Sequence, residues 1–176
     1  MFEKVKKSIA AFVIKRRYLR KDTKPVNFNN FFNNAKSILV IFPENQEHIK
    51  EALNVFSFIN TPSRKILIVV SDVNRSRLNL GVANKIISYT MEQKSFLKLP
   101  NSSLLNNICE TRFDVVIDLN LDENMFTSMI SAAADAVYKV GFSDQKLENL
   151  FNFQLGRNKI DSNINYKNLV DSLQMF

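Results

Sequence analysis

Short apolar runs alternate with helical stretches along most of the chain. The segments SILVIFP at 37–43, KILIVVSD at 65–72 and FDVVIDL at 113–119 are nearly continuous hydrophobic runs. Such runs are typical of strands that are covered on both faces. Residues 45–59, between the first two runs, instead carry their apolar residues at helical spacing. This alternation predicts an α/β fold with a mostly parallel sheet.

The remaining elements have weaker patterns. Three further helices are predicted, over residues 101–110, 123–135 and 164–175. Either Asn101 or Ser102 is placed to cap the first of them. Four further strands are predicted, near residues 86–89 and 95–97 and at 136–142 and 151–155. Together these elements make one three-layer α/β domain over residues 37–176.

The first 36 residues do not share this alternation. Residues 1–24 form a basic segment that we predict to be helical, and residues 25–36 form a polar connector. The connector carries Phe28, Phe31 and Phe32, whose rings we expect to anchor it on the domain.

The basic segment has an incomplete amphipathic pattern. One helical face carries five apolar residues, Phe2, Val5, Ile9, Phe12 and Val13. Arg16 and Arg20 continue that same face, so the pattern ends after about four turns of helix. The apolar stretch at 9–14 is too short for a signal peptide or a membrane span.

The net charge of +7 comes from this segment alone. Residues 1–24 hold nine basic and two acidic residues, whereas residues 25–176 hold fifteen of each sign. Its candidate contacts to a membrane or another polyanion are Lys4, Lys6, Lys7, Lys15, Arg16, Arg17, Arg20 and Lys21.

Three interpretations of the basic segment stay open. It packs its apolar face on the domain, it attaches the protein to anionic lipid, or it contacts RNA phosphates. Each basic residue near an anionic membrane contributes about 1 kcal/mol. Lipid is favoured over RNA because aromatic and basic residues do not interleave as in RNA-binding motifs. The corresponding location is cytoplasmic, with peripheral attachment to the inner membrane face.

The composition excludes several kinds of site. A single cysteine, Cys109, excludes a disulfide framework and a cysteine-based metal site, and His48 has no second histidine with which to share a metal. The three glycines, Gly81, Gly141 and Gly156, do not cluster after a strand as a phosphate-binding loop requires. We therefore predict no metal and no cofactor.

Polar residues follow three predicted strands, where ligands bind in open α/β sheets. The candidate catalytic residues are Glu47, His48 and Asp118, and the candidate ligand-binding residues are Glu44, Asp72 and Asn120. His48 would carry protons near neutral pH. Asp72 and Asp118 have a simpler interpretation as helix caps or turn formers, because Asp is favoured at both positions.

Residues 37–142 resemble the N-terminal lobe of heptosyltransferase-like glycosyltransferases, which have the GT-B fold. The resemblance rests on the ILVI strand, on FDVVIDL with Asp114 and Asp118, and on the strand that ends in Lys-Val-Gly at Gly141. It implies a Rossmann-like lobe. The pattern also resembles short, uncharacterised bacterial proteins that keep only this lobe.

The departures from that family concern catalysis. Its enzymes carry a Gly-Asp pair after the first strand, and the resemblance implies that this Asp activates the acceptor hydroxyl. Glu47 and His48 stand at those positions here. We also expect the chain to end where the family's donor-binding lobe would begin.

The leading hypothesis is therefore a non-catalytic, single-lobe relative that acts as a binding or interaction module. One alternative is an enzyme or enzyme subunit acting on a sugar-like or phosphorylated small molecule. A weaker one is an RNA- or ribosome-associated factor.

Overall fold

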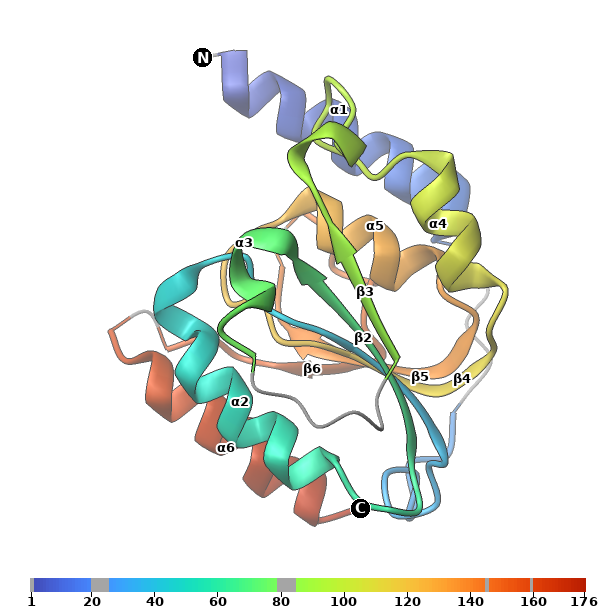
Figure 1. Ribbon diagram of the computed structural model, residues 1–176, viewed down its shortest axis with the longest axis vertical. Coiled ribbons are helices and arrows are strands. Elements are labelled where there is room, and N and C mark those ends of the chain that lie inside the picture. Colours follow the sequence, from blue (N-terminus) through green and yellow to red (C-terminus); the bar gives the residue numbers. More distant parts are fainter. Residues whose placement is uncertain (1, 20–25, 79–84, 145, 159) are drawn as a thin grey trace.

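The described part of the chain forms a six-stranded parallel sheet (Figure 1). The computed structural model describes residues 2–19, 26–78, 85–144, 146–158 and 160–176. The strands are β1 (Ser37–Ile41), β2 (Lys65–Ser71), β3 (Lys85–Tyr89), β4 (Phe113–Asp118), β5 (Ala136–Phe142) and β6 (Phe153–Leu155). Their order in the sheet is β3-β2-β1-β4-β5-β6, and each neighbouring pair is parallel. The predicted α/β fold with a parallel sheet is confirmed.

Helices cover both faces of this sheet. They are α1 (Phe2–Tyr18), α2 (Ile49–Ile59), α3 (Asp72–Arg75), α4 (Ser102–Cys109), α5 (Met125–Ala133) and α6 (Ser162–Gln174), with 3-10 turns η1 (Gln46–His48) and η2 (Met91–Gln93). Helices α2 and α6 lie side by side on one face, and α1, α4 and α5 lie on the other (Figure 1).

The sheet core explains the continuous apolar runs. In β1, Ile38 and Val40 pack toward α2 and α6, while Leu39 and Ile41 pack toward α1 and α5. All four side chains are fully buried. Because both faces of the central strands are covered, no polar alternation is needed along them.

Two predicted elements differ in the structure. The strand predicted at 95–97 is wrong, since the chain there makes a tight loop in which Ser95 N donates to Leu99 O at 2.8 Å. Lys98 takes a left-handed backbone conformation with φ 57°, which strand geometry does not allow. The helix predicted over 45–59 begins instead with η1, capped by Asn45, and becomes α2 at Ile49.

The connector is anchored as predicted. Phe31 and Phe32 are buried in the core. The Phe31 ring lies 4.7 Å from the ring of Tyr138 on β5 and 5.4 Å from the ring of Phe176 at the chain's C-terminal end. The rings therefore tie the connector to the sheet and to the segment after α6.

Helix α1 packs on α5 through a different face from the one its large apolar residues define. Ala10, Ala11 and Ile14 are buried in the interface with α5. Phe2, Val5, Ile9 and Phe12 of the predicted apolar face are exposed, whereas its fifth residue, Val13, is half-buried against the core. The interpretation that this face packs on the domain is therefore wrong for all of its residues except Val13. Small alanine side chains let the two helices approach closely, which the size of the exposed residues would prevent. Arg20 and Lys21 lie outside the described residues.

Candidate functional site

A cavity of about 390 Å³ opens at the carboxyl ends of β1 and β4. We call it the strand-end cavity. Its walls come from α1, the turn after β1, the loop after η2 and the segment that leads into α5. Its lining residues are Glu3, Lys6, Lys7, Pro43, Glu44, Asn45, His48, Lys94, Leu97, Lys98, Asn120, Leu121, Asp122, Glu123, Asn124, Met125 and Phe126.

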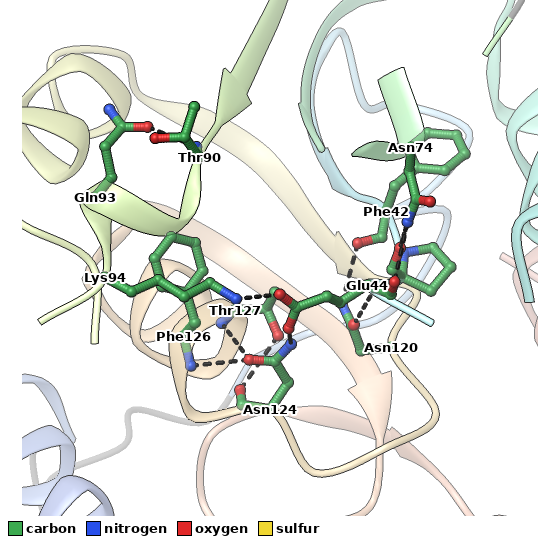
Figure 2. A network of polar contacts seen from close by, with 11 residues as sticks. Phe42, Glu44, Asn74, Thr90, Gln93, Lys94, Asn120, Asn124, Phe126 and Thr127 are labelled. Carbon is green, nitrogen blue, oxygen red and sulfur yellow. Dashed lines mark hydrogen bonds and ion pairs between the residues drawn. The ribbon is translucent and has the colours of Figure 1, made fainter. Parts of the chain in front are cut away.

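Glu44 occupies the centre of the polar network in this cavity, between Lys94 and Asn124 (Figure 2). One carboxylate oxygen pairs with the Lys94 ammonium group, and the other accepts a hydrogen bond of 2.7 Å from Asn124 Nδ2. The Lys94 side chain is only 9% exposed, and its ammonium lies 5.1 Å from the centre of the Phe126 ring. The ion pair is therefore covered on the lysine side and open on the glutamate side.

Two asparagine side chains hold the backbone of the turn after β1. Asn120 Oδ1 accepts from Glu44 N at 3.1 Å, and Asn120 Nδ2 donates to Phe42 O at 3.3 Å. From α3, the buried Asn74 Nδ2 donates to Pro43 O and to Glu44 O at 3.1 and 3.0 Å. These contacts position Glu44 without any glycine in the turn.

Asp118 is the last residue of β4 and forms the turn that leads to Asn120 in the wall of the strand-end cavity. Its Oδ1 accepts from Asn120 N at 3.0 Å and from Asn120 Nδ2 at 2.7 Å, and its Oδ2 accepts from Ser131 Oγ at 3.0 Å. Burial raises the pKa of Asp118, and the hydrogen bonds from Asn120 and Ser131 oppose that rise. The interpretation of Asp118 as a turn former is confirmed, and its catalytic role stays a prediction.

The other two candidate catalytic residues lie on η1. Glu47 is exposed and lines a second hollow of about 580 Å³, which also contains Arg157 and Asn158. His48 is half-buried and lines both this hollow and the strand-end cavity. Its Nδ1 is buried and has no hydrogen-bond partner among the described residues.

The structure thus brings together only part of the predicted set. Glu44, His48 and Asn120 meet at the strand-end cavity. Asp72 is the exposed first residue of α3, lies outside both hollows, and is not the N-cap of its helix, which is Ser71.

Two central residues were missed by sequence reasoning. Asn124 accepts hydrogen bonds from Phe126 N and Thr127 N, so it is the N-cap of α5, and a capping rule applied before the Met125 helix start would have found it. Lys94 lies in a stretch with no clear pattern, and its partner Glu44 is 50 residues away in sequence. No local signal marks that pair.

The cavity wall balances opposite charges. Lys6, Lys7, Lys94 and Lys98 face Glu3, Glu44, Asp122 and Glu123. Glu3 pairs with Lys98 at 3.0 Å, and Lys7 lies 3.9 Å from Glu123. Part of the basic segment is therefore a wall of this cavity, and its cations are matched there by carboxylates.

The wall of the strand-end cavity combines charged pairs, amides and an aromatic ring. Within the described residues, His, Cys, Asp and Glu form no group of three that could hold a metal ion. Paired charges, amide groups and the Phe126 ring instead present donors, acceptors and an apolar surface together. Hydroxyl-rich molecules use such contacts.

A family model matches residues 6–176, and its description is "Family of unknown function (DUF6913)". The chain belongs to this family. A comparison with curated proteins gives no match. Among solved structures, that of E. coli heptosyltransferase WaaC with ADP is similar, with a TM-score of 0.58 at 14% sequence identity.

The match to the heptosyltransferase covers 77% of this chain and 46% of that chain. The DUF6913 chain therefore spans about half the length of the transferase. The likeness establishes the fold of a glycosyltransferase lobe, in agreement with the resemblance in the strand segments.

Proposed function

We propose that this DUF6913 protein is a non-catalytic, single-lobe relative of GT-B glycosyltransferases that binds a ligand in the strand-end cavity. The observation that carries the proposal is the placement of Glu44. Both of its carboxylate oxygens already have partners, Lys94 and Asn124. Each carboxylate oxygen can accept more than one hydrogen bond, so Glu44 can still accept one from a ligand hydroxyl while Lys94 and Asn124 hold it in place.

The lobe-level likeness supports a binding role in this position. Ligands of open α/β sheets lie outside the carboxyl ends of the strands, which is where the cavity opens. The resemblance implies an acceptor-activating Asp after the first strand, and Glu47 and His48 stand there instead. The transferase activity of the longer enzyme is therefore not carried over to this lobe.

The ligand class follows from the wall of the cavity. Asn45 and Asn124 present neutral amides, and Lys94 and Glu44 present a charged donor and acceptor side by side. A sugar-like or phosphorylated small molecule fits these groups. Residues 1–24 would hold this module at a membrane surface or at another anionic partner.

A thermal-shift screen with monosaccharides, sugar phosphates and inorganic phosphate tests the cavity. A ligand should raise the melting temperature of the wild type but not that of Glu44→Gln or Lys94→Met. Asp72→Asn is the matched control, since Asp72 lies outside the cavity. A stabilising effect that survives both cavity substitutions would locate the binding site elsewhere.

A second candidate function is an enzyme that acts on the same class of molecule. It is favoured by His48, which lines both hollows and whose buried Nδ1 has no hydrogen-bond partner among the described residues. Product formation from a bound sugar phosphate that is abolished by His48→Ala would support the enzyme and contradict the non-catalytic module.

A further inference from the structure

Large apolar side chains are exposed in a row along α1. The exposed fractions are 68% for Phe2, 51% for Val5, 45% for Ile9 and 61% for Phe12. Their spacing of three and four residues places them on one face of the helix. Exposed apolar residues in such a contiguous arrangement mark an interaction surface, whereas single ones do not.

The row lies opposite the face that holds the helix on the domain. At 100° per residue, Val5 and Phe12 lie on the far side of the helix from Ala10 and Ile14, which are buried against α5. Docking through the row therefore requires no change in the packing of α1.

The row continues onto the loop after η2. The Phe96 ring is exposed and lies 6.4 Å from the Phe2 ring in an edge-on arrangement. The Lys6 ammonium lies 4.0 Å from the centre of the Phe96 ring and 4.9 Å from that of Phe2. We call Phe2, Val5, Ile9, Phe12 and Phe96 the α1 outer stripe.

Basic side chains border the α1 outer stripe on both sides. By helical geometry, Lys4 and Lys15 lie along one edge and Arg17 along the other, and Arg16 ends the stripe one turn after Phe12. The one acidic residue of α1, Glu3, is already paired with Lys98 at 3.0 Å and with Lys6 at 3.8 Å. The surface is apolar at its centre and cationic at its rim.

We propose that the α1 outer stripe docks the protein on an anionic lipid bilayer, with α1 lying in the plane of the interface. The docking proposal extends the proposed function and rests on it, because the part held at the membrane is the ligand-binding lobe. An interfacial helix buries its apolar side chains at the boundary of headgroups and acyl chains while its Lys and Arg residues meet anionic headgroups. Both halves of that requirement are present on this one face.

Charge favours the bilayer over a second copy of the chain. Two stripes pressed together would bring the basic rims of both copies, including Lys4, Lys15 and Arg16, into contact. Like charges in an interface disfavour association, whereas an anionic membrane neutralises them.

The stripe also gives the docking a spectroscopic test, because the chain contains no tryptophan. Phe12→Trp places a single reporter in the stripe, and Val73→Trp places one at an exposed position of α3 as the control. With equimolar phosphatidylcholine and phosphatidylglycerol vesicles, the Phe12→Trp emission should shift to the blue and be quenched by brominated acyl chains. The Val73→Trp emission should not change.

Co-sedimentation with the same vesicles measures the binding itself. Phe12→Glu should lower the vesicle partition coefficient by about tenfold or more. Val73→Glu, which changes the charge equally, should leave it near the wild-type value. The wild type should bind the mixed vesicles more strongly than vesicles of phosphatidylcholine alone. Replacing Lys4, Lys15 and Arg16 together by Gln should remove this difference.

Three results would overturn the docking proposal. The first is vesicle binding that leaves the Phe12→Trp emission unshifted, and the second is no binding to anionic vesicles. The third is a dimer, seen by sedimentation velocity, that dissociates in the Phe12→Glu variant.

The thermal-shift assay of the cavity contains no lipid, so the two proposals can fail separately. If the protein does not bind vesicles but a ligand still raises its melting temperature, only the docking surface is overturned. If the protein binds vesicles but no ligand raises its melting temperature, only the cavity ligand is overturned.

Discussion

The side-chain amide of Asn124 connects the start of α5 to the carboxylate of Glu44. Asn124 Oδ1 accepts from Phe126 N at 3.0 Å, and Nδ2 of the same amide donates to Glu44 Oε2 at 2.7 Å. One side chain thus caps a helix and orients the central carboxylate of the strand-end cavity. The stability of α5 and the geometry of the cavity are therefore coupled at this residue.

Substitution of Asn124 should separate these two roles. Asn124→Ser keeps a capping oxygen but loses the contact to Glu44, whereas Asn124→Ala loses both. We expect Asn124→Ala to lower the free energy of unfolding by about 1 kcal/mol relative to Asn124→Ser, in urea denaturation. Both variants should lose the ligand-induced thermal shift. Equal stability of the two variants would mean that the cap contributes nothing to folding.

The connector rings make a second prediction. Phe31 is buried among the rings of Phe28, Tyr138 and Phe176, whereas Phe96 is exposed. Phe31→Ala should therefore lower the free energy of unfolding by about 3–5 kcal/mol. Phe96→Ala is the matched control and should change it by less than about 0.5 kcal/mol. Similar losses in the two variants would contradict the burial of the connector.

Phe31 and Phe96 differ in how well the sequence predicts their surroundings. Continuous runs such as 37–43 and 113–119 identified the buried strands, because a parallel sheet covered on both faces needs no polar positions. Phe31 was correctly expected to anchor the connector. Phe96 was placed in a strand, although nothing in its immediate neighbours distinguishes a strand from a loop.

The packing face of α1 shows a second limit. Large side chains such as Phe12 dominate an amphipathic pattern, but the helix is held by Ala10, Ala11 and Ile14. Close helix packing selects small residues, and their contribution to the pattern is weak. The candidate site was predictable where it followed strand ends, as for Glu44 and Asn120. It was not predictable for Lys94, which reaches the site only through the tertiary fold.

A half-buried lysine on β5, Lys139, predicts a pH dependence of stability. Burial lowers the pKa of Lys139 to about 8 from its ordinary value of 10.5, while its ammonium donates to Ala132 O at 2.8 Å. Between these two values the unfolded chain binds more protons than the folded one, so this group makes stability rise with pH from about 8 to 10.5. Below pH 8 the full cost of burying the charge is present.

Lys139→Met removes this ionisation and therefore isolates its effect. The unfolding free energy of the variant minus that of the wild type should be largest at pH 7 and should fall by about 3 kcal/mol between pH 8 and 10.5. Urea denaturation over this range measures it, and Lys167→Met on the exposed face of α6 serves as control. A difference that stays constant with pH would show that Lys139 is not charged and half-buried at neutral pH.

The Glu44–Lys94 pair should respond unequally to the loss of either partner. The Lys94 side chain is 9% exposed, whereas that of Glu44 is 37% exposed. Glu44→Gln leaves a covered ammonium without its counter-ion, and we expect it to cost about 3 kcal/mol of unfolding free energy. Lys94→Met leaves a carboxylate that water can reach and keeps an apolar contact with Phe126, so its cost should be below about 1 kcal/mol.

The double variant decides whether this asymmetry comes from the unpaired charge. Replacing both partners removes the buried ammonium, so the double variant should be more stable than Glu44→Gln alone. A double-mutant cycle in urea measures this directly. Additive losses, with the double variant least stable of all, would mean that Lys94 and Glu44 contribute independently and that the pair does not organise the cavity.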